Sequence, residues 1–172
     1  MSDKNNPGNT GELFNHPTDI GFTNDNEMFV SDGYGNTHVH HFNDSGELVK
    51  IWREIGSEQG SFITPHSILV DQKDRMLVTG RENNRVQIFD QNGNYLKKLS
   101  NVYHPMDMYQ DKYGLIYVTE QVLALHLFNT NDEFIGRCRT FGTFGDGLTV
   151  DKYDDIYIAE MLPNKLTKLS LI

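Results

Sequence analysis

The stretch Met28-Phe29-Val30-Ser31-Asp32 recurs in three further versions along the chain. These are Met76-Leu77-Val78-Thr79-Gly80, Ile116-Tyr117-Val118-Thr119-Glu120 and Ile156-Tyr157-Ile158-Ala159-Glu160. Their last residues stand at positions 32, 80, 120 and 160, so the spacings are 48, 40 and 40 residues. Self-similarity at such a period indicates a repeat architecture.

A second landmark keeps the same spacing. Upstream of each run stands a short opening segment that begins with Pro or Gly: Pro17-Thr18-Asp19-Ile20, Pro65-His66-Ser67-Ile68, Pro105-Met106-Asp107-Met108 and Gly145-Asp146-Gly147-Leu148. The runs are short, rich in β-branched and aromatic residues, and bounded by turn residues, as strands are. Four antiparallel strands in each repeat of about 40 residues are typical of propeller blades.

The sequence therefore predicts an all-β propeller of four repeats, each an antiparallel four-stranded blade. We expect the blades near residues 14–54, 62–100, 102–140 and 143–172, after a polar, disordered N-terminal segment at residues 1–13. The last repeat ends at its third strand, so an incomplete ring is one expectation. An exposed edge strand such as Leu166 to Leu171 pairs readily with another chain, which predicts self-association through blade edges.

The composition and net charge limit the kinds of partner and the location that we expect for this protein. The chain has 172 residues and a formal net charge of −9, with no cluster of Lys and Arg, so we expect no nucleic acid partner. No apolar run approaches the length of about 18 residues that a membrane helix needs. The polar start has no apolar signal region, so we expect a cytoplasmic protein. The single cysteine, Cys138, excludes an internal disulfide.

Several motifs resemble those of a known family. Val30-Ser31-Asp32-Gly33-Tyr34-Gly35-Asn36, Pro65-His66-Ser67 and Arg81-Glu82-Asn83-Asn84-Arg85 are similar to successive motifs of the NHL-repeat propellers, most closely peptidyl-α-hydroxyglycine α-amidating lyase (peptidylamidoglycolate lyase) and its bacterial relatives. The resemblance implies a propeller of six blades. It also implies a lyase that splits peptidyl-α-hydroxyglycine into a peptide amide and glyoxylate, with a zinc ion held by three His, a calcium site nearby, and a Tyr and an Arg at the reacting centre.

The resemblance assigns individual residues. His66 falls on one zinc-binding His and Tyr34 on the catalytic Tyr, while Asp146 and Gly147 stand where the family has a zinc-binding His and a calcium-binding Asp. We find no counterpart in this chain for the remaining zinc His and the reacting-centre Arg. We therefore assign no cofactor, keep zinc at His66 and Asp146 as an open alternative, and expect no calcium.

The residues themselves allow two interpretations of this site. In an antiparallel blade the start of the first strand and the end of the second lie at the same end, so His66 and Asp146 come from alternate blades and can approach each other across the axis. The rim acids Asp19, Asp32, Asp107, Glu120 and Glu160 either join such a site or, as we prefer, hydrogen-bond loop amides.

The remaining conspicuous residues are expected to be structural. We expect His38, His40 and His41 to lie on a solvated strand, because alternation places His41 on the opposite face from the other two. Trp52 and Phe62 are expected in the core between blades, Cys138 is expected to pack in a fourth strand, and Arg81, Glu82 and Arg85 are expected to form a surface ion-pair group.

Two functions follow. The first is a catalytically degraded, lyase-like propeller that binds a peptide or protein on one face. The alternative is a zinc-dependent lyase completed by oligomerisation or by further chain, and metal content distinguishes the two.

Overall fold

The computed structural model describes residues 14–170 as fifteen strands and one short 3-10 helix. Blade 1 is β1 (Asp19–Phe22), β2 (Met28–Asp32), β3 (His38–Phe42) and β4 (Leu48–Trp52). Blade 2 is β5 (Pro65–Val70), β6 (Met76–Gly80), the helix η1 (Arg81–Asn83), β7 (Arg85–Phe89) and β8 (Tyr95–Leu99). Blade 3 is β9 (Pro105–Gln110), β10 (Ile116–Glu120), β11 (Ala124–Phe128) and β12 (Phe134–Arg139), and blade 4 is β13 (Thr143–Val150), β14 (Ile156–Leu162) and β15 (Lys165–Leu169).

Each blade is an antiparallel sheet whose strands pair in chain order, so the prediction of an all-β propeller of four repeats is confirmed. Three blades have four strands and blade 4 has three. The predicted polar segment at residues 1–13 lies outside the described residues. Within residues 14–170 no helix has the length and hydropathy to cross a membrane.

The core lies between the blades rather than inside one sheet. One cluster joins blades 1 and 2 around Phe29, Trp52, Phe62 and Phe89, which confirms the expectation for Trp52 and Phe62. Equivalent clusters join blade 2 to blade 3 and blade 3 to blade 4. Strands buried on both faces become nearly continuous apolar runs, which explains the repeated motif at the second strand.

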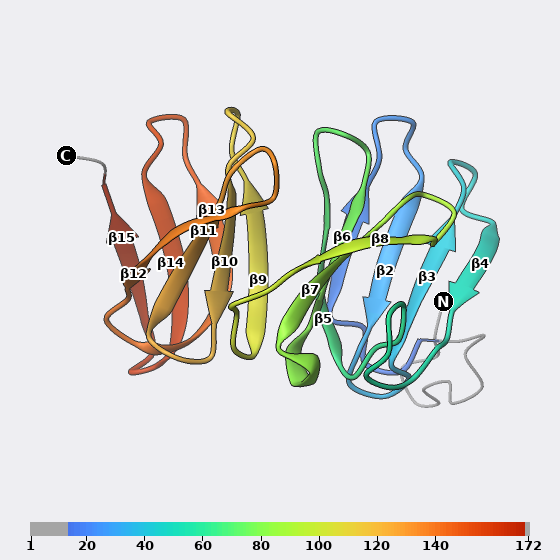
Figure 1. Ribbon diagram of the computed structural model, residues 1–172, viewed down its shortest axis with the longest axis horizontal. Helices are drawn as coiled ribbons and strands as arrows, with labels where there is room; N and C mark the ends of the chain where they lie inside the picture. Colours follow the sequence, from blue (N-terminus) through green and yellow to red (C-terminus); the bar gives the residue numbers. More distant parts are fainter. Residues whose placement is uncertain (1–13, 171–172) are drawn as a thin grey trace.

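The four blades form an open arc. Each innermost strand contacts the next, from β1 through β5 and β9 to β13, but β1 and β13 have no comparable contact in the described part of the chain. Blades 1 and 4 lie at opposite ends of the long axis (Figure 1). The free face of blade 1 leaves Ile20 and Phe22 exposed at 48% and 58%, whereas the equivalent Ile68 in blade 2 is 3% exposed.

A buried acid at or near the end of the second strand fixes the loop that enters each of three blades. Asp32 accepts a hydrogen bond from the Asn15 backbone N–H at 2.9 Å. Glu120 accepts one from Tyr103 at 2.6 Å, and Glu160 accepts one from Gly142 at 2.7 Å. In blade 2, where Gly80 replaces the acid, the Asn83 side chain accepts from the Ile63 N–H at 2.7 Å instead. The expectation that the rim acids bind loop amides is confirmed for Asp32, Glu120 and Glu160, whereas Asp19 and Asp107 accept from amides of neighbouring innermost strands.

Asp32→Ala should destabilise the protein by roughly 3 kcal/mol, because the Asn15 N–H and the Asn36 side-chain amide lose their buried acceptor. Urea unfolding measures this change. Asp25→Ala, at an exposed turn of the same blade, is the matched control and should alter stability by less than about 0.5 kcal/mol. Equal losses in the two variants would contradict the assigned role of Asp32.

Candidate functional site

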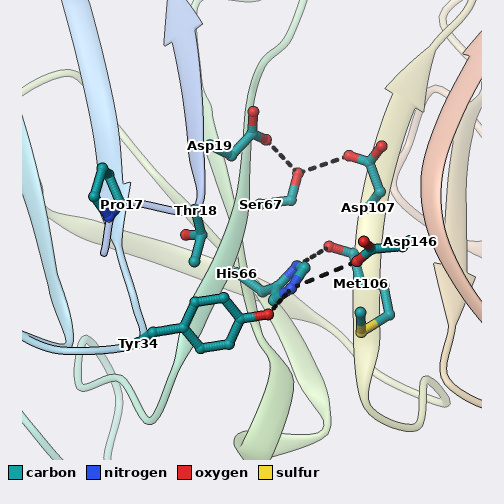
Figure 2. Close-up of a pocket in the computed structure, with 9 residues that line it drawn as sticks. All are labelled: Pro17, Thr18, Asp19, Tyr34, His66, Ser67, Met106, Asp107 and Asp146. Carbon is teal, nitrogen blue, oxygen red and sulfur yellow. Dashed lines mark hydrogen bonds and ion pairs between the residues drawn. The ribbon is translucent and has the colours of Figure 1, made fainter. Parts of the chain in front are cut away.

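The candidate site is a cavity of about 240 Å³ at the end of the blades where the innermost strands begin. Figure 2 shows the nine residues that line it, which come from all four blades: Pro17, Thr18, Asp19, Tyr34, His66, Ser67, Met106, Asp107 and Asp146. Because neighbouring innermost strands run side by side, residues about 40 positions apart in the sequence meet there.

His66 is the centre of this cavity. Its Nδ1 lies 2.9 Å from the Met106 carbonyl oxygen of the next blade, and since only an N–H donates to a carbonyl, Nδ1 carries the proton. Nε2 therefore presents its lone pair to the Tyr34 hydroxyl at 2.9 Å and lies 3.7 Å from Asp146 Oδ1. Burial lowers the pKa of His66, which favours the neutral ring.

Tyr34 reaches this ring from the loop between β2 and β3. The loop passes so close to its neighbours that a Cβ on Gly33 would lie 2.0 Å from the Pro65 carbonyl oxygen, so a residue without a side chain is required there. Arg81 Nη1 donates to the Tyr34 hydroxyl oxygen at 3.2 Å, and its guanidinium lies 5.2 Å from the ring centroid. Tyr34 thus links a cation to His66.

A row of hydrogen bonds crosses three blades beside His66. Ser67 Oγ lies 2.7 Å from Asp19 Oδ2 and 2.9 Å from Asp107 Oδ1. Asp19 also accepts from the Ile68 N–H of blade 2 at 3.0 Å, and Asp107 accepts from the Leu148 N–H of blade 4 at 2.8 Å. Each aspartate therefore joins its own innermost strand to the next one.

This row needs a proton that Ser67 does not supply. A hydroxyl group has one hydrogen, so Ser67 donates to only one of its two carboxyl neighbours at a time. Burial raises the pKa of Asp107 to about 6, against hydrogen bonds from Met108, Leu148 and Ser67 that lower it. Below that pH Asp107 is protonated and donates to Ser67, which donates to Asp19.

The structure brings the three residues assigned from the sequence, Tyr34, His66 and Asp146, into one cavity. Sequence reasoning missed the contact of Arg81 with Tyr34 and the link that Ser67 makes between the aspartates. Two signals were available. Arg81 directly follows the second strand, as Gly33 does in blade 1, and Ser67 holds the repeat position of Asp19 and Asp107.

Two structural expectations were wrong. His38, His40 and His41 are buried rather than solvated, because β3 lies inside its sheet. His41 stacks on Phe29 and bonds to Glu27, while His40 lies 3.5 Å from Asp32. Arg85 does not join Arg81 and Glu82 either, since it donates to the carbonyl groups of Ser57, Glu58 and Ser61.

The donor set does not fit a tightly held zinc ion. His66 Nε2 and Asp146 Oδ1 face the same space, but a catalytic zinc site uses three protein ligands. Within residues 14–170 no group of three or more His, Cys, Asp or Glu side chains is placed to hold a metal ion. The same cavity is lined by carboxyl groups, an imidazole and a phenol, groups that can form hydrogen bonds and ion pairs without a metal.

The chain is similar in sequence to several known proteins. No family model matches the chain. The chain is 39% identical over 89 residues to peptidylglycine alpha-amidating monooxygenase of Rattus norvegicus, covering 48% of this chain and 9% of that protein. It is 33% identical over 92 residues to the probable peptidyl-alpha-hydroxyglycine alpha-amidating lyase pgal-1 of Caenorhabditis elegans, covering 52% of this chain and 26% of that protein. It is 30% identical over 79 residues to NHL repeat-containing protein 3 of Mus musculus, covering 45% of this chain and 23% of that protein.

Solved structures agree on the fold. An inactive H270A virginiamycin B lyase from Staphylococcus aureus with quinupristin superimposes with a TM-score of 0.74 at 14% identity, covering 90% of this chain and 52% of that one. The protein is thus a β-propeller whose innermost strands form a polar cavity. More narrowly, it is an NHL-type propeller related to the amidating-lyase family, although it spans only a small part of the curated relatives it matches.

The carboxyl of Asp107 should make stability depend on pH. Its folded pKa of about 6 lies above the ordinary value of an aspartate, near 4, so the folded state holds a proton that the unfolded state loses, and stability falls as pH rises from about 4 to 6. In Asp107→Asn this contribution, about 3 kcal/mol, should be absent. Urea unfolding at several pH values measures the difference, and parallel pH profiles for the two proteins would refute the assignment.

Proposed function

We propose that this chain is a catalytically degraded relative of the amidating lyases that binds a peptide through the Tyr34–His66–Asp146 cavity. The observation that carries this proposal is Asp146, which lies 3.7 Å from His66 Nε2 where the resembled lyases have a metal-binding His. The Asp146 carboxylate beside the His66 imidazole suits a cationic group better than it suits a catalytic metal.

Charge supports a cationic group as the ligand. Asp19, Asp107 and Asp146 line the cavity, and the Asp146 side chain is 47% exposed. The neighbouring cation, Arg81, is engaged by Glu82 at 2.9 Å and by Tyr34. The net charge of −9 also steers a positive ligand toward the protein. A lysine or arginine side chain, or the amino terminus of a peptide, has the chemistry to bind there.

The lyase remains a second candidate because Tyr34 and His66, which stand at the positions of the catalytic Tyr and of one zinc-binding His, lie 2.9 Å apart in one cavity. It needs a third zinc ligand, from a second subunit or from chain beyond these residues. The relative from Caenorhabditis elegans, named as a probable amidating lyase, favours this candidate.

Binding should depend on the positive charge of the ligand. In an NMR titration, acetyl-Gly-Lys-Gly-amide should shift the His66 and Tyr34 resonances, whereas the same peptide with norleucine in place of lysine should not. Asp146→Asn should weaken binding about tenfold, since one charged hydrogen bond is lost. Asp25→Asn, the same charge change at the far end of blade 1, should leave the affinity within about twofold. Equal shifts from the two peptides would refute a cationic ligand.

Metal content distinguishes the two functions. After incubation with zinc and gel filtration, we expect far less than one zinc ion per chain, because two protein ligands hold zinc weakly. His66→Ala should lower the unfolding midpoint equally in zinc and in chelator, since it removes the bonds to Met106 and Tyr34 in both. One zinc per chain that survives gel filtration and disappears in His66→Ala would establish the lyase instead.

A further inference from the structure

The row formed by Asp19, Ser67 and Asp107 offers two acceptors to one hydrogen. The Ser67 hydroxyl oxygen lies 2.7 Å from Asp19 Oδ2 and 2.9 Å from Asp107 Oδ1, with one carboxyl group on either side of it (Figure 2). Two oxygen atoms at hydrogen-bond distance repel each other when no hydrogen lies between them, and the single hydrogen of a hydroxyl group serves only one of these contacts. The row therefore lacks one hydrogen-bond donor.

In the empty cavity a proton on Asp107 supplies this donor. Burial raises the pKa of Asp107 to about 6. A proton on its Oδ1 donates to Ser67, and the acid still accepts the backbone bonds that hold it. These come from the Met108 N–H at 2.7 Å and the Leu148 N–H at 2.8 Å. Protonation thus completes the row without breaking a bond between blades.

The groups that face Asp107 come from every innermost strand. Four further titratable side chains line the cavity with it: Asp19 of β1, Tyr34 of the loop between β2 and β3, His66 of β5, and Asp146 of β13. On its own blade, the Thr119 hydroxyl of β10 accepts from the Asp107 N–H at 3.1 Å and carries no charge. Among the lining residues that the structure describes, none is Lys or Arg. A positive charge in the cavity is therefore supplied by the ligand.

We propose that a cationic ligand that enters the cavity displaces the proton of Asp107, so that the site exchanges one positive group for another. This inference rests on the proposed function, since it concerns the same cavity and the same class of ligand. The O–H bond of the acid breaks, the proton passes to solvent, and the electron pair stays on the carboxylate. An ammonium group has three N–H donors, so it supplies the donor that the row then lacks.

The exchange gives binding a dependence on pH with a definite sign. A cavity of about 240 Å³ is narrow, so a positive charge inside it lies within a Debye length of Asp107. That charge favours the carboxylate form and lowers the pKa of Asp107. By linkage, protonation weakens binding by the same factor by which the ligand weakens protonation. The ligand is therefore held more strongly above about pH 7 than below about pH 6.

NMR titrations with acetyl-Gly-Lys-Gly-amide at pH 5 and pH 7.5 test the exchange, because the lysine stays charged at both. We expect the affinity to be at least about threefold weaker at pH 5. The carboxyl-carbon resonance of Asp107 reports its proton directly in the unmodified protein. Without peptide it should titrate with a midpoint near pH 6, and saturating peptide should lower this midpoint by more than about half a pH unit.

Two variants connect the pH dependence to Asp107. Asp107→Asn has no proton to exchange, so its affinity for the lysine peptide should differ by less than about 1.5-fold between the two pH values. Asp25→Asn makes the same change at an exposed turn of blade 1 and should keep the full pH dependence. If Asp107→Asn does not fold, the carboxyl-carbon titration of the unmodified protein decides the question by itself.

The outcomes separate this inference from the proposed function. Binding of the lysine peptide with equal affinity at both pH values, and with an unchanged Asp107 midpoint, would overturn the exchange and leave the cationic ligand in place. A pH dependence that persists in Asp107→Asn and follows the titration of the His66 ring would also overturn it, because the proton would then belong to His66. No binding of the lysine peptide at either pH would overturn both proposals.

Discussion

The carboxylate that bridges neighbouring innermost strands is the interaction on which the rest of this structure depends. Asp19 accepts from the Ile68 N–H of blade 2, and Asp107 accepts from the Leu148 N–H of blade 4. Ser67 lies between the two carboxyl groups and joins them. These bonds set the spacing of the innermost strands at one end of the blades. They therefore place His66 against Met106 and Asp146, which makes the cavity a consequence of how the blades are joined.

The same arrangement explains why apolar residues are exposed at both ends of the arc. A blade buries its apolar face against its neighbour, so the first blade exposes Ile20 and Phe22, which a preceding blade would cover. Among residues 14–170, blade 4 has three strands, and Cys138 of blade 3, which was expected to pack in its strand, is exposed. The cavity lies at neither place, and its lining residues make their hydrogen bonds within the four blades.

Much of the fold could be predicted from the sequence because each repeat contains the same strand motif. The motif ending at Asp32, Gly80, Glu120 and Glu160 fixes the period, and short apolar runs with turn residues fix the strands. The meeting of His66, Tyr34 and Asp146 also followed, since all three stand at the same end of their blades. Burial of the histidines of β3 did not, because alternation along one strand does not reveal that both its faces are covered. The roles of Arg81 and Ser67 depend on atoms of neighbouring blades, and one strand read alone does not show them.

Amide hydrogen exchange at Ile68 and Leu148 tests the central claim most directly, because these two N–H groups donate to carboxylates across blades rather than along a strand pair. The account predicts that both amides exchange as slowly as those of β6 and β10. It also predicts that Asp19→Ala accelerates exchange at Ile68 far more than at Leu148. Exchange at loop-like rates in the unmodified protein, or equal acceleration at both amides, would contradict a cavity built by aspartate bridges.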